Sequence, residues 1–130
     1  MSVELSPIIA GVMNWGVWDK NLNTNEFTHL INLFIENGIT TFDHADIYGG
    51  YTTEASFGKA LSGSKIDRKK IQLITKCGIQ YISENRPNNS IKHYEYSKDY
   101  IIWSAENSLK NLQTDYLDVF LLHRPSPLMQ

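Results

Sequence analysis

Short apolar runs alternate along the chain with stretches whose apolar residues recur at helical spacing. The apolar runs have strand length and predict four strands, at residues 7–13, 39–45, 71–75 and 117–122. The stretches between them predict three helices, between residues 23 and 38, over 53–61, and from residue 97 to about 113. Strands that alternate with helices in this way favour an α/β fold with a parallel sheet and right-handed crossover connections.

Residues that commonly start and end helices flank these stretches. Asn23 is followed three residues later by Glu26, which is the pattern of a capping box. Gly38 stands where glycine often ends a helix, and Ser97 is a favourable N-cap for the third helix. The polar stretch 79–96 predicts a long loop, and loops of this length are often functional or mobile.

Two architectures fit this order of elements. A (β/α) barrel and a flavodoxin-like open sheet are both built from successive βα units, and the periodicity alone does not separate them. The turn after the first predicted strand reads GVMNWG over residues 11–16. This is not the GxGxxG pattern of a dinucleotide-binding Rossmann fold, so that fold is disfavoured.

The composition is that of an ordinary globular chain. The 130 residues carry a net charge of −2 and a pI near 6.0, which gives no indication of a nucleic-acid partner. Cys77 is the single cysteine, so the chain has no internal disulfide, and this suits a reducing compartment. We find no signal peptide and no apolar run long enough for a membrane helix. We therefore expect a cytoplasmic protein without a membrane partner.

Ionisable residues follow one another at the ends of the predicted strands. Asp43, Lys76 and His123 end the second, third and fourth strands, and Tyr48 comes five residues after Asp43. In a parallel barrel these strand ends share one face, where active sites are built from the βα loops. We expect the four side chains to meet there.

The four residue types suit proton transfer to an oxyanion. A phenol is a poor acid–base catalyst at neutral pH, but a nearby ammonium favours its phenolate form. The Asp43 carboxylate would hold Lys76 charged and in place, and a neutral His123 can donate a hydrogen bond to a carbonyl oxygen. Such a site protonates an oxygen as hydride reaches carbon, and hydride requires a cofactor because no side chain supplies it.

Three segments resemble the aldo-keto reductase family. FDHADIYGGYTTEASFGKAL contains the pattern D-x-A-x-x-Y as Asp43, Ala45 and Tyr48. ITKCG places Lys76 in the family's lysine context, and SAENSLKNLQTDYLDVFLLHRP resembles the segment that leads to the strand-end histidine. The resemblance is closest to a bacterial branch of oxidoreductases. It implies a (β/α)₈ TIM barrel, of which residues 1–130 would be the N-terminal portion, a half-barrel of about four βα units ending after the fourth strand.

The resemblance also implies a role for each candidate residue. Tyr48 would be the general acid, Lys76 the charge that assists it, Asp43 the partner of the lysine, and His123 the group that orients the substrate. The cofactor would be NADP(H), bound partly by Asp43 and by the first βα turn, Gly11, Val12 and Met13. The substrate would be a small aldehyde or ketone.

Half of such a barrel leaves two hypotheses open. A complete barrel takes about 250 residues, and its phosphate site usually follows strands seven and eight. Residues 1–130 are therefore either part of an NADP(H)-dependent carbonyl reductase or a catalytically silent fragment that acts as an oligomeric or interaction module. Without the other strands the edges of the sheet stay unpaired, so we expect a homo-oligomer.

Other residues have alternative explanations. His44 and Asp46 form an H-x-D pair that suggests a metal ligand set, but further ligands are missing, so we predict no metal site. Trp15 and Trp18 suit either a substrate pocket or the core, and we expect Cys77 to be a buried, unreactive thiol.

Overall fold

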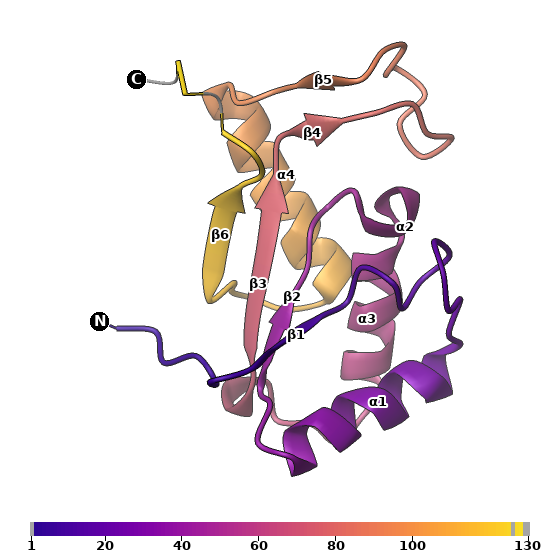
Figure 1. Cartoon of the computed structure of the whole chain (residues 1–130), viewed down its shortest axis with the longest axis vertical. Coiled ribbons are helices and arrows are strands. Elements are labelled where there is room, and N and C mark those ends of the chain that lie inside the picture. The colour runs from indigo at the N-terminus through magenta and orange to yellow at the C-terminus, as the bar shows by residue number, and fades with distance from the viewer. Residues whose placement is uncertain (1, 126, 129–130) are drawn as a thin grey trace.

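A four-stranded parallel sheet forms the centre of the computed structural model, which describes residues 2–125 and 127–128 (Figure 1). Its strands are β1 (Ile9–Gly11), β2 (Thr41–Asp43), β3 (Gln72–Cys77) and β6 (Val119–Leu122), in the order β1-β2-β3-β6. Every neighbouring pair is parallel. Each strand of this sheet lies beside the one that precedes it, as in a barrel, whereas a flavodoxin-like sheet changes direction after its first strand. The half-barrel prediction is confirmed.

Three main helices lie on one side of this sheet (Figure 1). They are α1 (Thr24–Glu36), α3 (Thr53–Ser62) and α4 (Lys98–Leu112). The capping box is present, since the Asn23 side chain accepts from the Glu26 N–H at 3.0 Å and Glu26 accepts from the Asn23 N–H at 2.7 Å. Ser97 caps α4, and Gly38 follows α1 in the left-handed region. The predicted helix ends are therefore confirmed to within one or two residues.

Several short elements escaped the sequence prediction. They are α2 (Tyr48–Tyr51), the 3₁₀ turn η1 (Arg68–Lys70), and an antiparallel pair, β4 (Ile79–Gln80) with β5 (His93–Tyr94). The last two lie in the stretch that was predicted to be a loop throughout. Two-residue strands carry no detectable periodicity, because alternation needs several residues to show.

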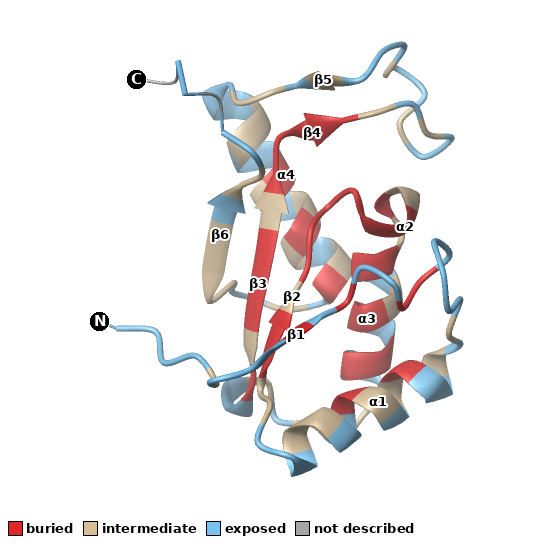
Figure 2. Ribbon diagram, in the orientation of Figure 1, coloured by how far each residue is buried: buried red, intermediate tan, exposed pale blue. Residues whose placement is uncertain are grey.

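The two faces of the central sheet differ in what covers them (Figure 2). On the helix side, Phe42 and Leu73 are fully buried and pack with Phe27 and Phe57 in one core. On the opposite face, Ile9 of β1 is 43% exposed and Leu121 of β6 is 42% exposed. The helix side therefore supplies most of the apolar burial that stabilises this fold. No helix among the described residues is long and apolar enough to cross a bilayer.

At the amino end of the sheet, an ion pair connects η1 with the start of β6. The Arg68 guanidinium lies 2.7 Å from the Asp118 carboxylate and also donates to Thr114 and to the carbonyls of Ile71 and Tyr116. The same Asp118 oxygen accepts the Leu73 N–H of β3 at 2.8 Å. This network fixes where β6 begins beside β3, and therefore which residue of that segment reaches the carboxyl end.

Candidate functional site

The parallel sheet brings the four candidate residues to its carboxyl end. Asp43 is the last residue of β2, Lys76 is the penultimate residue of β3, and His123 directly follows β6. The His123 N–H donates to the Cys77 carbonyl at 2.7 Å, which continues the β3–β6 ladder by one step. Tyr48 begins α2, in the connection that follows β2.

Two glycines set the path of the chain after Tyr48. Gly49 (φ 61°) and Gly50 (φ 66°) both lie in the left-handed region, which side-chain-bearing residues seldom adopt. A Cβ on Gly49 would also lie 2.4 Å from the Thr53 hydroxyl oxygen. The Tyr-Gly-Gly sequence therefore lets the chain turn sharply into α3 while Tyr48 stays at the rim.

Lys76 and Asp43 form an ion pair at this rim. The Lys76 Nζ atom lies 2.7 Å from Asp43 Oδ1 and 2.8 Å from Oδ2, and it donates to the His44 carbonyl at 2.7 Å. Three acceptors thus match the three donors of the ammonium. They hold the positive charge in one place.

The tyrosine lies beside this charge and beside the histidine. The Lys76 Nζ atom is 5.4 Å from the centroid of the Tyr48 ring, and the ring centroids of Tyr48 and His123 are 6.4 Å apart, nearly perpendicular. Tyr48 is 9% exposed, and the Trp18 ring contacts it from the outer side. Among the described residues the ammonium donates its hydrogen bonds to Asp43 and His44, so it acts on Tyr48 through its charge.

His123 is suited to act as a neutral imidazole. Burial lowers the pKa of His123 below its ordinary value, and the positive charges of Lys76 and Arg124 lower it further, against a smaller opposite effect of Asp43. Its Nδ1 atom is buried without a hydrogen-bond partner among the described residues. A neutral imidazole can donate one hydrogen bond to a ligand at this rim. The structure therefore brings Asp43, Tyr48, Lys76 and His123 together.

The residues of the first βα turn, beside the same rim, differ in how far they are exposed. Gly11 is exposed and a Cβ there would meet no atom within 4 Å, and the Met13 side chain is 45% exposed. Val12 is fully buried in the core, its N–H donates to the Asp43 carbonyl, and its own carbonyl accepts from Trp15. Gly11 and Met13 are thus open to a ligand, whereas Val12 supports the turn.

Two carboxyl groups lie buried behind the rim, and the sequence prediction did not give them a role there. Asp46 accepts from the hydroxyls of Tyr100 (3.3 Å) and Ser104 (3.4 Å), and Glu54 accepts from Thr75 (2.6 Å). Burial, followed by the charge of Glu54, raises the pKa of Asp46 to about 7. Only the folded chain shows this, since these three partners come from α4 and β3, which are far from Asp46 and Glu54 in the sequence.

His44 lies in the same buried layer. Burial and the charge of Lys76 lower the pKa of His44 to about 3, and the ring packs edge-on against Phe57 at 4.4 Å between centroids. The described residues contain no group of three or more His, Cys, Asp or Glu side chains placed to hold a metal ion. The structure gives His44 a packing role. Cys77 is buried as well, and burial raises the pKa of its thiol to about 11.

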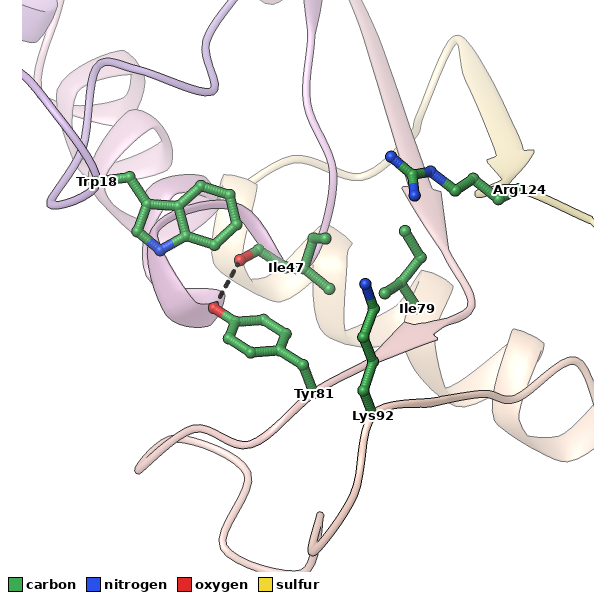
Figure 3. A pocket seen from close by; sticks show the side chains of 6 residues that line it. All are labelled: Trp18, Ile47, Ile79, Tyr81, Lys92 and Arg124. Carbon is green, nitrogen blue, oxygen red and sulfur yellow. Dashed lines mark hydrogen bonds between the residues drawn. The ribbon is translucent and has the colours of Figure 1, made fainter.

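A cavity of about 280 Å³ adjoins the rim (Figure 3). Its described lining residues are Trp18, Ile47, Ile79, Tyr81, Lys92 and Arg124. The sequence left open whether Trp15 and Trp18 line a pocket or belong to the core. In the structure Trp15 is buried in the core and Trp18 lines the cavity. Lys92 and Arg124 were not foreseen, since exposed cations on loops carry no pattern of their own.

Comparison with known proteins agrees with this geometry. Residues 7–130 match the family model "Aldo/keto reductase family". The oxidoreductase YcsN of Bacillus subtilis (strain 168) is 50% identical over 127 residues, which are 98% of this chain and 42% of that protein. The 6-dehydroglucose reductase of Agrobacterium fabrum is 39% identical over 127 residues, again 98% of this chain and 42% of the relative.

Solved structures show the same fold. The holo form of the aldo-keto reductase AKR11C1 from Bacillus halodurans superposes with a TM-score of 0.74 at 30% identity. The match covers 93% of this chain and 37% of that one. The chain thus spans about two fifths of the length of the relatives it matches.

Proposed function

Because this chain belongs to the aldo/keto reductase family, we propose that it carries the proton-transfer half of an NADP(H)-dependent carbonyl reductase. The substrate would be an aldehyde or ketone, which is reduced to the alcohol. The observation that supports this most is the convergence of Tyr48, Lys76, Asp43 and His123 at one end of the sheet. The free, buried Cys77 suits a reducing, cytoplasmic location.

Each residue has a distinct task in this proposal. The carbonyl oxygen of the substrate accepts hydrogen bonds from the Tyr48 hydroxyl and from the neutral His123 imidazole, which polarises the carbonyl and orients it. As negative charge develops on that oxygen, Tyr48 gives up its proton to it. The Lys76 ammonium, 5.4 Å from the ring, stabilises the tyrosinate that remains, and Asp43 keeps the ammonium in position.

The nicotinamide cofactor, when bound, supplies the hydride. The residues present fit its reactive end, because Gly11 leaves open space at the first βα turn and Met13 is exposed beside it. Asp43 lies next to Gly11 in the sheet register, so the turn and the ion pair share one rim. We assign these residues to the nicotinamide side of the site.

Cofactor binding and turnover test this proposal. NADPH is titrated into the chain while tryptophan fluorescence is followed, since Trp18 lies beside the rim. Saturable quenching at micromolar NADPH, followed by loss of NADPH absorbance on addition of an aldehyde, is the expected result. No saturable signal up to millimolar NADPH would instead favour the second candidate, a silent fragment.

The open sheet face favours that second candidate, in which the chain acts as an oligomeric module. The edge strands β1 and β6 expose Ile9 and Leu121, and each has an edge that no described strand covers. We propose that two copies cover these edges by pairing, as unpaired strands tend to do. Light scattering at micromolar concentration should give the mass of a dimer or larger species, and a monomer would count against pairing.

A further inference from the structure

We propose that the cavity beside the rim binds an anionic group, a carboxylate, carried by the carbonyl substrate. This inference rests on the proposed reductase function and adds a substrate class to it. It starts from the cavity lining, which contains two cationic side chains, Lys92 and Arg124, beside apolar and aromatic ones. No carboxylate of the described residues lines the cavity. A site of this composition discriminates by charge.

The two cations are available to a ligand. Neither Lys92 nor Arg124 forms an ion pair with a carboxylate in the part of the chain that the structure describes. Figure 3 shows both side chains on one side of Ile47, with the rings of Trp18 and Tyr81 on its other side. An acid with a flat apolar body therefore finds stacking surfaces and positive charge within one cavity.

Residues that line the cavity adjoin the reacting groups. Trp18 contacts the Tyr48 ring at 6.1 Å between centroids and the Tyr81 ring at the same distance. Arg124 directly follows His123, and Ile47 directly precedes Tyr48. A ligand in this cavity thus lies beside the groups that would polarise and protonate its carbonyl.

The fold brings the backbone of both cationic residues to the cavity. The Tyr96 hydroxyl donates to the carbonyls of His123 and Arg124, the latter at 2.8 Å, which ties the segment before α4 to the end of β6. Arg124 itself adopts a left-handed conformation, with φ of 59°. Lys92 lies next to β5, whose pairing with β4 brings it to the same side as Ile79.

Phosphates of the cofactor are a second source of negative charge. The same two cations would attract a diphosphate, so a binding experiment must separate the two ligands. Substrate recognition predicts that the charge preference is present without any cofactor. Recognition of the cofactor predicts that loss of the cations weakens NADPH binding and leaves aldehyde binding unchanged.

A matched pair of aldehydes tests the inference on the chain without cofactor. The probes are 4-formylbenzoate and its neutral methyl ester, and the readout is the NMR signal of the Trp18 indole N–H, which the variant W18F identifies. We expect 4-formylbenzoate to bind roughly tenfold more tightly than the ester at low salt, with the preference shrinking as salt is raised. Equal affinities, or no shift of the Trp18 signal, would overturn the inference.

Charge-removing variants assign the preference to the two cations. Lys92→Gln and Arg124→Gln should each reduce the preference for the acid about threefold, whereas Lys110→Gln, on the exposed surface of α4, should leave it intact. Equal losses in all three variants, or weaker NADPH binding with unchanged aldehyde binding, would contradict it. Selective binding of the acid without NADPH turnover would support the anion site while counting against the proposed reductase.

Discussion

Two ion pairs at opposite ends of the central sheet have the same length and very different surroundings. Arg68–Asp118 at the amino end and Lys76–Asp43 at the carboxyl end both span 2.7 Å. Arg68 is surrounded by backbone carbonyls and by the Tyr116 ring, 3.9 Å away. All its neighbours are structural, and its charge connects η1 with the segment at the start of β6. Lys76 instead has a phenol and an imidazole nearby. The neighbours of an ion pair, more than its length, indicate its role.

Removing the phenol oxygen at the carboxyl end should have the largest effect. In the proposed reductase, Tyr48→Phe removes the acid while keeping the ring that packs on Trp18 and His123. We expect kcat to fall about a thousandfold, with stability changed by less than about 0.5 kcal/mol. NADPH absorbance gives the first quantity and urea unfolding the second.

The matched control lies at the other end of the sheet. Tyr116→Phe removes a phenol oxygen beside Arg68, where no chemistry is expected, and kcat should stay unchanged. A comparable loss of kcat in both variants would mean that the two ends do not differ in function.

Breaking the ion pair at the amino end should instead lower the stability of the fold. Asp118→Asn leaves the Arg68 guanidinium without its counter-charge in a place where both side chains are less than a fifth exposed. We expect a loss of about 2 kcal/mol in the free energy of unfolding, measured in urea, because a mostly buried charge loses its partner.

Aldehyde binding provides the contrast for that variant. Asp118→Asn should leave the preference for 4-formylbenzoate unchanged. Asp43→Asn, at the carboxyl end, should mainly lower kcat and have a smaller effect on the free energy of unfolding. If Asp118→Asn left stability intact, the structural role assigned to the amino-end pair would be wrong.

An effect of similar size that depends on pH concerns the buried carboxyl group behind the rim. Burial raises the pKa of Asp46 from 3.8 to about 7, so the folded chain holds a proton that the unfolded chain releases between these values. Its contribution to stability therefore falls as pH rises from about 4 to about 7. Asp46→Asn removes this dependence. When the pH is raised from 5 to 8, the free energy of unfolding of the variant should increase by roughly 2 kcal/mol relative to that of the wild type.

Urea unfolding at the two pH values measures this difference. In both proteins His44 is neutral in the folded chain at these pH values and titrates only in the unfolded chain, so its opposite effect cancels in the comparison. Asp115→Asn, at an exposed position, should show the same pH dependence as the wild type. An Asp46→Asn variant that tracks the wild type at both pH values would show that this group is ionised throughout.

The candidate site could be predicted from the sequence wherever a short motif carried it. Tyr48 and Asp43 lie in one such motif, and Lys76 and His123 follow strands whose apolar runs are easy to recognise. The short pair β4 and β5 was missed because two residues show no alternation. Lys92 and Arg124 were missed for a related reason, since an exposed cation on a loop looks the same whether or not it faces a cavity.

The sequence determined the order of strands and helices, the helix caps and the four residues at the rim. Local periodicity and strand-end positions depend on neighbours in the chain, so they can be read from it directly. The tertiary structure decided the separation of Trp15 from Trp18, the buried partners of Asp46 and the cavity that contains both cations. These depend on segments such as β2 and α4, which lie more than fifty residues apart. Burial and electrostatic environment arise only when such segments pack, so no local pattern encodes them.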